Sequence, residues 1–179
     1  MTVHEPLTLI TDFILAIASG VFGALLWRKG NRFWAIGFFF TAAGSLLGGT
    51  YHGFGGLWIW IACVYSIGLA SFFFLWPFSR VIASVIFIVY AAWMTIHYID
   101  FKWVIIDYGV TIVLLAILMR SKWMTAFVLV SVAGAIVQQA PIPFHNDIYH
   151  VIQLFGLWLL YRAGLVMMPA RGQLTTQPT

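Results

Sequence analysis

Long apolar stretches separated by short polar segments run through almost the whole chain. The separators are rich in basic residues, glycine or proline, as at 28–32, 53–56 and 141–143. The seven stretches cover residues 7–27, 33–51, 57–77, 81–98, 101–119, 123–138 and 147–168. Each approaches the roughly 20 apolar residues of a membrane-spanning helix, and none alternates as a strand of a membrane barrel would. The pattern predicts an all-α integral membrane protein with a bundle of seven transmembrane helices.

The composition strengthens this prediction. Of the 179 residues, 63% are hydrophobic and only 8% are charged, whereas a soluble domain carries about 25% charged residues. So few charged side chains cannot cover the surface of a soluble globule. We expect one transmembrane domain over residues 1–169 and a disordered cytoplasmic tail over 170–179. No soluble catalytic domain fits beside them.

The basic residues predict the orientation of the bundle. If all seven stretches cross the membrane, eight of the nine basic residues fall on one side and only Lys102 falls on the other. Basic loops favour the cytoplasmic side, so we expect an extracytoplasmic N-terminus and a cytoplasmic C-terminus. No basic cluster beyond 28–32 suggests nucleic acid as a partner. Short loops and the absence of a cleavable signal favour a bacterial inner membrane.

The acidic residues and histidines gather in the opposite, extracytoplasmic half. Asp12 and Asp107 lie about 8 Å inside their helices at 1.5 Å per residue. His150 lies at a similar depth, and His52 closes the second stretch. Ionisable groups at such depth usually face the bundle interior, pair with one another or mark a functional site. The alternative is a set of structural hydrogen bonds between helices.

Helical spacing groups these polar residues on shared faces. The groups are Glu5, Thr8 and Asp12 in the first stretch, Asp107 and Thr111 in the fifth, and Asn146, His150 and Gln153 in the seventh. Histidines from two helices and one further ligand would suffice for a zinc site with an open water position. Zinc would activate that water. The spacing is not specific for a metal, because no HExxH or CxxC motif is present.

Other motifs narrow the choice. Gly44 and Gly48 form a GxxxG motif, which predicts a close contact between helices. Cys63 is the only cysteine, so no intramolecular disulfide is possible. The seventh stretch contains no lysine, which excludes a retinal Schiff base of the rhodopsin type.

Three short segments carry a resemblance to a known superfamily. Residues 5–12 open the first stretch with Glu-x-x-Thr-x-x-Thr-Asp, residues 48–52 close the second with Gly-x-x-x-His, and residues 146–150 open the seventh with Asn-x-x-x-His. They resemble the Glu-x-x-Asn, Ser-x-x-x-His and His-x-x-x-His motifs of the seven-helix superfamily that contains the alkaline ceramidases and the progestin and adiponectin receptors. The chain is identified as a divergent member of that superfamily.

The resemblance implies a zinc-dependent hydrolysis of a lipid amide. Its metal ligands would be His52, His150 and either His145 or Asn146. Its acid/base group would be Asp107, Asp147 or Asp12, with Glu5, Thr8, Asn146 and Gln153 as supporting polar residues. The chain departs from the motifs at Gly48 and Asn146, and residues 57–66 lack the acid that the family carries in its third helix.

Three hypotheses for function follow. The first is a membrane-embedded metal-dependent hydrolase that acts on a lipid amide or ester, with its site in the extracytoplasmic half. The second is a non-enzymatic receptor or carrier that binds a metal ion, a proton or a lipid in the same polar pocket, which the departures favour. The third is a structural or partner-binding subunit whose polar cluster only holds helices together. All three place membrane lipid around the protein.

Overall fold

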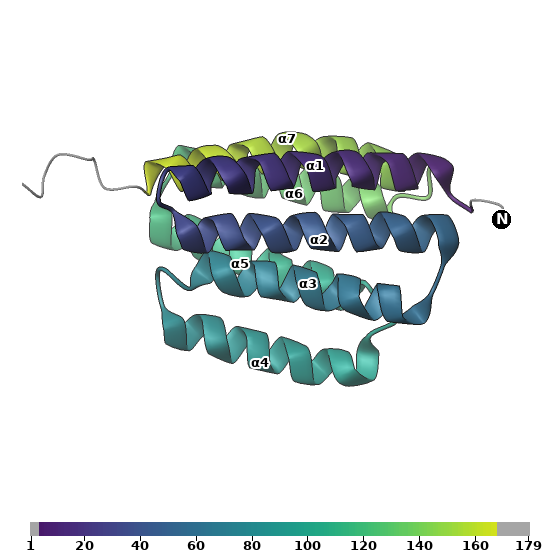
Figure 1. Cartoon of the computed structure of the whole chain (residues 1–179), viewed down its shortest axis with the longest axis horizontal. Helices are drawn as coiled ribbons and strands as arrows, with labels where there is room; N and C mark the ends of the chain where they lie inside the picture. The colour runs from purple at the N-terminus through teal and green to yellow at the C-terminus, as the bar shows by residue number, and fades with distance from the viewer. Residues whose placement is uncertain (1–3, 168–179) are drawn as a thin grey trace, which may run out of the picture.

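Seven α-helices run along one common axis in the part of the chain that the structure, a computed structural model, describes, residues 4–167 (Figure 1). They are α1 (Pro6–Arg28), α2 (Arg32–Phe54), α3 (Leu57–Leu75), α4 (Arg80–His97), α5 (Lys102–Met119), α6 (Lys122–Gln139) and α7 (His145–Val166). The predicted helix count is therefore confirmed. No helix end differs from its predicted position by more than three residues, the largest difference being Phe54 against the expected 51. The tail predicted at 170–179 lies outside the described residues.

Local sequence explains where several helices begin and end. Pro6 begins α1, a position where its missing N–H leaves no hydrogen bond unmade. Gly55 follows α2 with φ of 74°, a backbone conformation that glycine adopts readily. The Ser79 side chain accepts a hydrogen bond from the backbone N–H of Ile82 and so caps α4.

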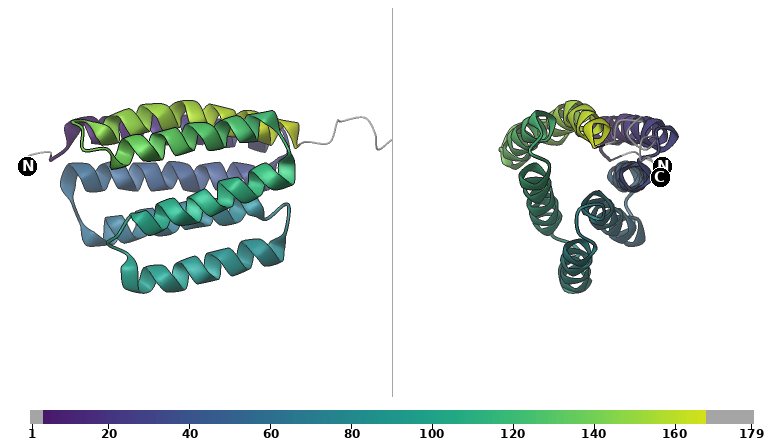
Figure 2. Two further views of the ribbon diagram at one scale, coloured as in Figure 1. Left: turned by 180° about the vertical axis from the view of Figure 1, so that it is seen from behind. Right: turned by 90° about the vertical axis from the view of Figure 1, so that its left-hand side faces the viewer.

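Six helices form a ring and the seventh lies outside it. Around the ring, α1 packs against α2, α2 against α3, α3 against α5, α5 against α6, α6 against α7, and α7 against α1. The end-on view in Figure 2 shows α6, α7 and α1 in a row, with α2 and α3 below them on one side and α5 on the other. Helix α4 packs against α3 and α5 from outside.

The two ends of the bundle differ in composition. Because consecutive helices run in opposite directions, Arg28, Arg32, Arg80, Arg120 and Lys122 lie at one end, which we call the basic end. The other end, which carries Glu5, His52, Asp100 and Asp147, is called the acidic end. Large side chains fill the interior towards the basic end, among them Trp34, Phe38, Phe74 and Phe127, all fully buried.

Five of the described helices, α1 to α5, are long and apolar enough to cross a membrane. The outward side chains are also apolar. Ile17 on α1 is 69% exposed, and Ile96 on α4 is 76% exposed. The seven-helix, all-α class is therefore established, with most of its length suited to an apolar surrounding.

Candidate functional site

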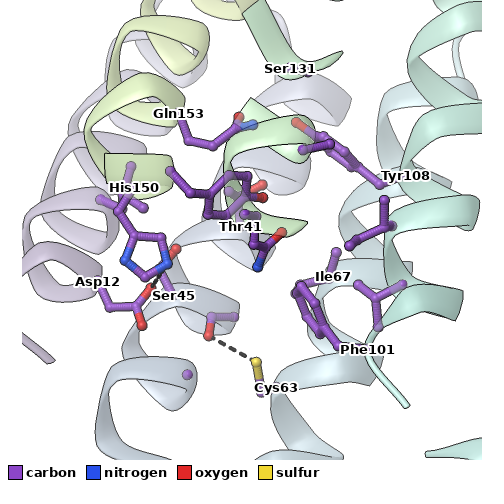
Figure 3. Close-up of a pocket in the computed structure, with 18 of the residues that line it drawn as sticks. Asp12, Thr41, Ser45, Cys63, Ile67, Phe101, Tyr108, Ser131, His150 and Gln153 are labelled. Carbon is purple, nitrogen blue, oxygen red and sulfur yellow. Dashed lines mark hydrogen bonds and ion pairs between the residues drawn. The ribbon is translucent and has the colours of Figure 1, made fainter. Parts of the chain in front are cut away.

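A cavity of about 420 Å³ lies inside the ring (Figure 3). Every ring helix lines it, while α4 contributes no residue. Its polar wall includes Asp12, His52, Cys63, Tyr108, Ser131, Gln138, Asn146, His150 and Gln153. Its apolar wall includes Leu15, Ile67, Val104, Ile112 and Leu157. The cavity therefore has a polar part and an apolar part, as small-molecule sites commonly do.

Asp12 and His150 form a buried contact between α1 and α7 in the wall of the cavity. His150 Nε2 lies 3.5 Å from Asp12 Oδ1, and both side chains are less than one-tenth exposed. On the other side of the imidazole ring, His150 Nδ1 lies 2.9 Å from Thr11 Oγ1. The Thr11 hydroxyl lies 3.1 Å from the carbonyls of both Leu7 and Thr8 in its own helix, and when its one hydrogen is donated there, its oxygen accepts from the His150 tautomer that carries a hydrogen on Nδ1. This leaves Nε2 facing the Asp12 carboxyl group.

The pair can hold a proton at the cavity wall. In the His150 tautomer with its hydrogen on Nδ1, a second proton between Nε2 and Asp12 Oδ1 joins two groups that otherwise face each other with lone pairs. Polar groups buried in this way need such a partner to offset their lost hydration. The arrangement can therefore bind a hydrogen-bonding ligand or take up a proton, and it needs no third residue for either.

Glycines of α2 make the space that Asp12 occupies. A Cβ atom on Gly49 would lie 2.8 Å from Asp12 Cβ, and one on Gly48 would lie 3.5 Å from Asp12 Oδ2 and from Cys63 Sγ. A Cβ atom on Gly44 would lie 3.0 Å from the Ile67 side chain. The close helix contact predicted from the GxxxG motif is confirmed.

The acidic end is held together by a second set of polar contacts. Glu5 Oε2 lies 3.0 Å from His52 Nδ1, and Glu5 N donates to the His52 carbonyl over 3.2 Å. The His4 N–H donates to Gly53 O over 3.2 Å. The start of α1 is thus tied to the end of α2 by side chain and backbone, while His52 also lines the cavity.

The residues expected around the start of α7 divide between two places. Asn146, His150 and Gln153 line the cavity together, as their shared helical face indicates. Asp147 instead accepts a hydrogen bond from Thr8 Oγ1 over 3.0 Å. The ring of His145 contacts the carbonyl of Ile142 at 3.1 Å through Nδ1, away from the cavity lining.

Asp107 does not line the cavity. Its side chain is buried, and it lies within reach of Ser71 on α3 without a well-formed hydrogen bond. Asp107 Oδ2, Ser71 Oγ and Thr111 Oγ1 are all buried and have no hydrogen-bond partner among the described residues. Asp107 therefore lies at the α3–α5 contact, and Thr111, one turn further along α5, is also buried outside the cavity lining.

Sequence patterns missed several cavity residues. Ser131 and Gln138 on α6 line the cavity, and their side-chain oxygens are buried with no hydrogen-bond partner in the described part of the chain. Tyr108 and Cys63 also lie in the wall (Figure 3). Serine and glutamine spaced seven residues apart on a helix share a face, which is the signal that could have identified them.

The described residues do not assemble a metal-ligand set. Within 4–167, no group of three or more His, Cys, Asp and Glu side chains is close enough to hold a metal ion. His150 has both ring nitrogens facing protein oxygens, and His145 does not reach the cavity. The three-ligand zinc centre that the resemblance implied therefore stays a prediction.

The fold and the cavity together place the chain in the structural class of all-helical bundles, here with seven helices and an internal site that is partly polar. The chain belongs to the family of unknown function DUF6962, whose profile matches residues 7–169. No curated protein and no solved structure matches the chain.

Proposed function

We propose that the chain is an integral membrane protein with its acidic end on the extracytoplasmic side. The apolar outer surface supports this, because side chains such as Ile17 and Ile96 would otherwise be exposed to water. The concentration of basic residues at one end supports the orientation. A bacterial inner membrane suits the short connections between helices.

The function that the site supports best is binding of a small, lipid-like molecule in the cavity, as a receptor or a carrier. The observation that carries this proposal is the cavity of about 420 Å³ inside the ring of helices, whose wall combines polar residues such as Asp12, His150 and Gln153 with apolar residues such as Leu15 and Ile67. Small-molecule sites commonly combine an apolar lining with a few polar groups. A molecule in the cavity would bury its apolar part and form hydrogen bonds with its polar part.

The wall also limits the chemistry of the ligand. Among residues 4–167, no lysine or arginine lines the cavity, and the lining carboxylate is Asp12. An anionic headgroup would therefore find no cation to pair with. A mostly apolar molecule with a neutral or basic polar group fits, with that group near Asp12, His150 and Gln153 and its apolar part against Leu15 and Ile67.

Molecules that remain bound during purification test this proposal. We expect solvent extraction and mass spectrometry of the detergent-purified protein to yield one enriched compound, close to one per chain. Ile67→Trp fills the cavity and should remove it. Ile88→Trp adds the same side chain on the outer face of α4, where Ile88 is 63% exposed, and should retain it. Equal recovery from the two variants would contradict the cavity as the binding site.

The lone cysteine supplies an independent measurement. Cys63 lines the cavity and its Sγ donates to the Gly44 carbonyl over 3.3 Å. We expect Cys63 to react with N-ethylmaleimide faster in folded protein from which the bound molecule has been removed in detergent than in protein that still contains it. Identical rates in both preparations would argue that nothing occupies the space beside Cys63.

A metal-dependent hydrolase that acts on a lipid amide or ester is the second candidate. The observation that favours it is that His52 on α2 and His150 on α7 open onto the same cavity. It predicts near-stoichiometric zinc in the purified protein and loss of that zinc in His52→Ala and in His150→Ala. Folded wild type without metal after zinc supplementation would exclude this candidate and leave ligand binding.

A further inference from the structure

The contact between α6 and α7 at the basic end contains a cluster of two cations and two tryptophans. The Arg162 guanidinium lies 4.3 Å from the ring centre of Trp123 and 5.6 Å from that of Trp158. The Lys122 ammonium lies 5.4 Å from the same Trp123 ring. The two indole rings are themselves in edge-to-face contact, with their centres 5.7 Å apart. We call these four residues the Arg162 cluster.

Within the described part of the chain, the Arg162 cluster has no acidic partner. The ion pairs of residues 4–167 involve Glu5, Asp12 and Asp100, none of which lies at the basic end. The remaining two acids are Asp107, which faces α3, and Asp147, which bonds to Thr8. Two like charges against one indole ring repel each other, and no acidic side chain of residues 4–167 neutralises them, so a bound anion would relieve the repulsion.

Other cation–tryptophan contacts at this end are simpler. Arg32 lies 5.5 Å from the Trp27 ring, and Arg80 lies 5.5 Å from the Trp76 ring. Each is a single cation on a single indole. Among the described residues of the basic end, two cations thus contact the same indole ring only at Trp123. Arg32 and Arg80 are matched positions that can serve as controls.

We propose that the Arg162 cluster binds the phosphate of an anionic phospholipid. This rests on the proposed location of the chain in a membrane. A guanidinium held by two indole rings presents its N–H groups in a fixed fork, which suits a phosphate. Basic pockets between transmembrane helices on the cytoplasmic side are known to bind such headgroups.

Depth along α7 favours a lipid over a soluble phosphate. Arg162 lies four residues before the end of α7 at Val166, about 6 Å inside the helix at 1.5 Å per residue. One turn deeper, Trp158 stacks against Phe155 with ring centres 5.6 Å apart, and Phe155 is 54% exposed on the outer surface. An acyl chain attached to a phosphate at Arg162 would lie along this aromatic surface.

Lipid retention measured by native mass spectrometry tests the proposal. The full chain is purified in a mild detergent with equal parts of phosphatidylglycerol and phosphatidylcholine. We expect wild type to retain phosphatidylglycerol preferentially. Arg162→Gln should lower that preference about fivefold, the factor for one basic residue beside an anionic headgroup. Arg80→Gln removes an equal charge from the same end and should leave the preference unchanged.

Further variants distinguish the possible failures. Lys122→Gln changes an exposed residue in the first turn of α6 and provides the test if Arg162→Gln does not fold. An equal loss in the Arg80 and Arg162 variants would mean a diffuse attraction and would overturn the site. Complete competition by excess inorganic phosphate would identify a soluble anion and overturn the lipid. Absence of any retained lipid, neutral or anionic, would instead contradict the proposed membrane location.

Discussion

Asp12 and Asp107 look alike in the sequence, yet the structure gives them opposite surroundings. Each lies five or six residues inside an apolar helix. Asp12 faces His150 and lines the cavity, with room provided by glycines on α2. Asp107 lies near Ser71 of α3 and outside the cavity lining, and one of its oxygens is buried with no partner among residues 4–167. The depth of an acid in a helix therefore does not identify its role, because the role depends on the helix that it faces.

The difference has a structural cause in the ring. Helix α1 lies between α2 and α7, so a residue on its inner face meets both a glycine-rich surface and the polar face of α7. Helix α5 contacts α3, whose residues near Asp107 offer one hydroxyl, Ser71. We expect the different surroundings of Asp12 and Asp107 to predict whether replacing each acid lowers or raises the free energy of unfolding.

The largest expected effect comes from replacing each acid with leucine. Asp12→Leu leaves His150 without its partner and adds bulk against Gly49, so the free energy of unfolding should fall by about 2–4 kcal/mol. Asp107→Leu removes an unsatisfied buried oxygen, so stability should stay the same or rise by about 1 kcal/mol. Unfolding with SDS in mixed micelles measures both changes.

Isosteric variants serve as the control for this pair. Asp12→Asn keeps a polar group opposite His150 and should lose less stability than Asp12→Leu, whereas Asp107→Asn should differ little from wild type. Equal losses in the two leucine variants would mean that Asp107 has a partner as strong as that of Asp12, and the contrast between them would fail.

A smaller effect is expected from the glycines that make room for Asp12. Gly49→Ala places a methyl group 2.8 Å from Asp12 Cβ and 3.0 Å from the Phe13 ring, so unfolding should become easier by about 1–3 kcal/mol. Gly20→Ala on α1 is the matched control, because no atom lies within 4 Å of its added carbon. Alanine favours helix there, so stability should not fall. If both substitutions behaved alike, the close fit around Asp12 would be refuted.

The smallest effect is expected for Asp100, an exposed acid that serves as a reference for the two buried acids, Asp12 and Asp107. A hydrogen bond and the charge of Lys102 lower the pKa of Asp100 from its ordinary value. Because the pKa is lower in the folded state than in the unfolded chain, the ionised carboxylate stabilises the fold at pH values above the unfolded pKa of about 3.9. This stabilisation is lost as the pH falls below that value and through the folded-state pKa. Because the Lys102–Asp100 pair is exposed, Asp100→Asn should change Tm by less than about 1 °C at neutral pH. A change as large as that of Asp12→Leu would contradict this ranking.

Much of the fold could be predicted because long apolar helices are encoded by continuous apolar stretches of sequence. Each stretch ends where charged, glycine or proline residues begin, so helix ends such as Arg28 and Met119 were close to the expected positions. The position of α4 outside the ring could not be predicted. Its stretch at 81–98 is as apolar as the others, and hydropathy carries no information on which neighbour a helix chooses.

The candidate site was predictable only in part, for a related reason. Helical spacing correctly grouped Asn146, His150 and Gln153 on one face, and all three line the cavity. The same logic grouped Asp107 with Thr111, but periodicity fixes a shared face and not its direction. Whether Asp12, His52 and His150 bind a metal, and whether any acid acts as a catalyst, stays a prediction.

The pairing of α1 with α7 sets the order in which the site can be completed during synthesis. Thr11 and His150 are 139 residues apart, so the partner of the first helix is made among the last. At a ribosome speed of ~5–20 residues per second, roughly 7–28 s pass between the synthesis of Thr11 and that of His150. Through that interval Asp12 relies on the glycine surface of α2 alone. In the proposed membrane location, a stalled or shortened chain would thus present an unpaired carboxyl group within the bilayer, by which cellular quality control could distinguish unfinished molecules from finished ones.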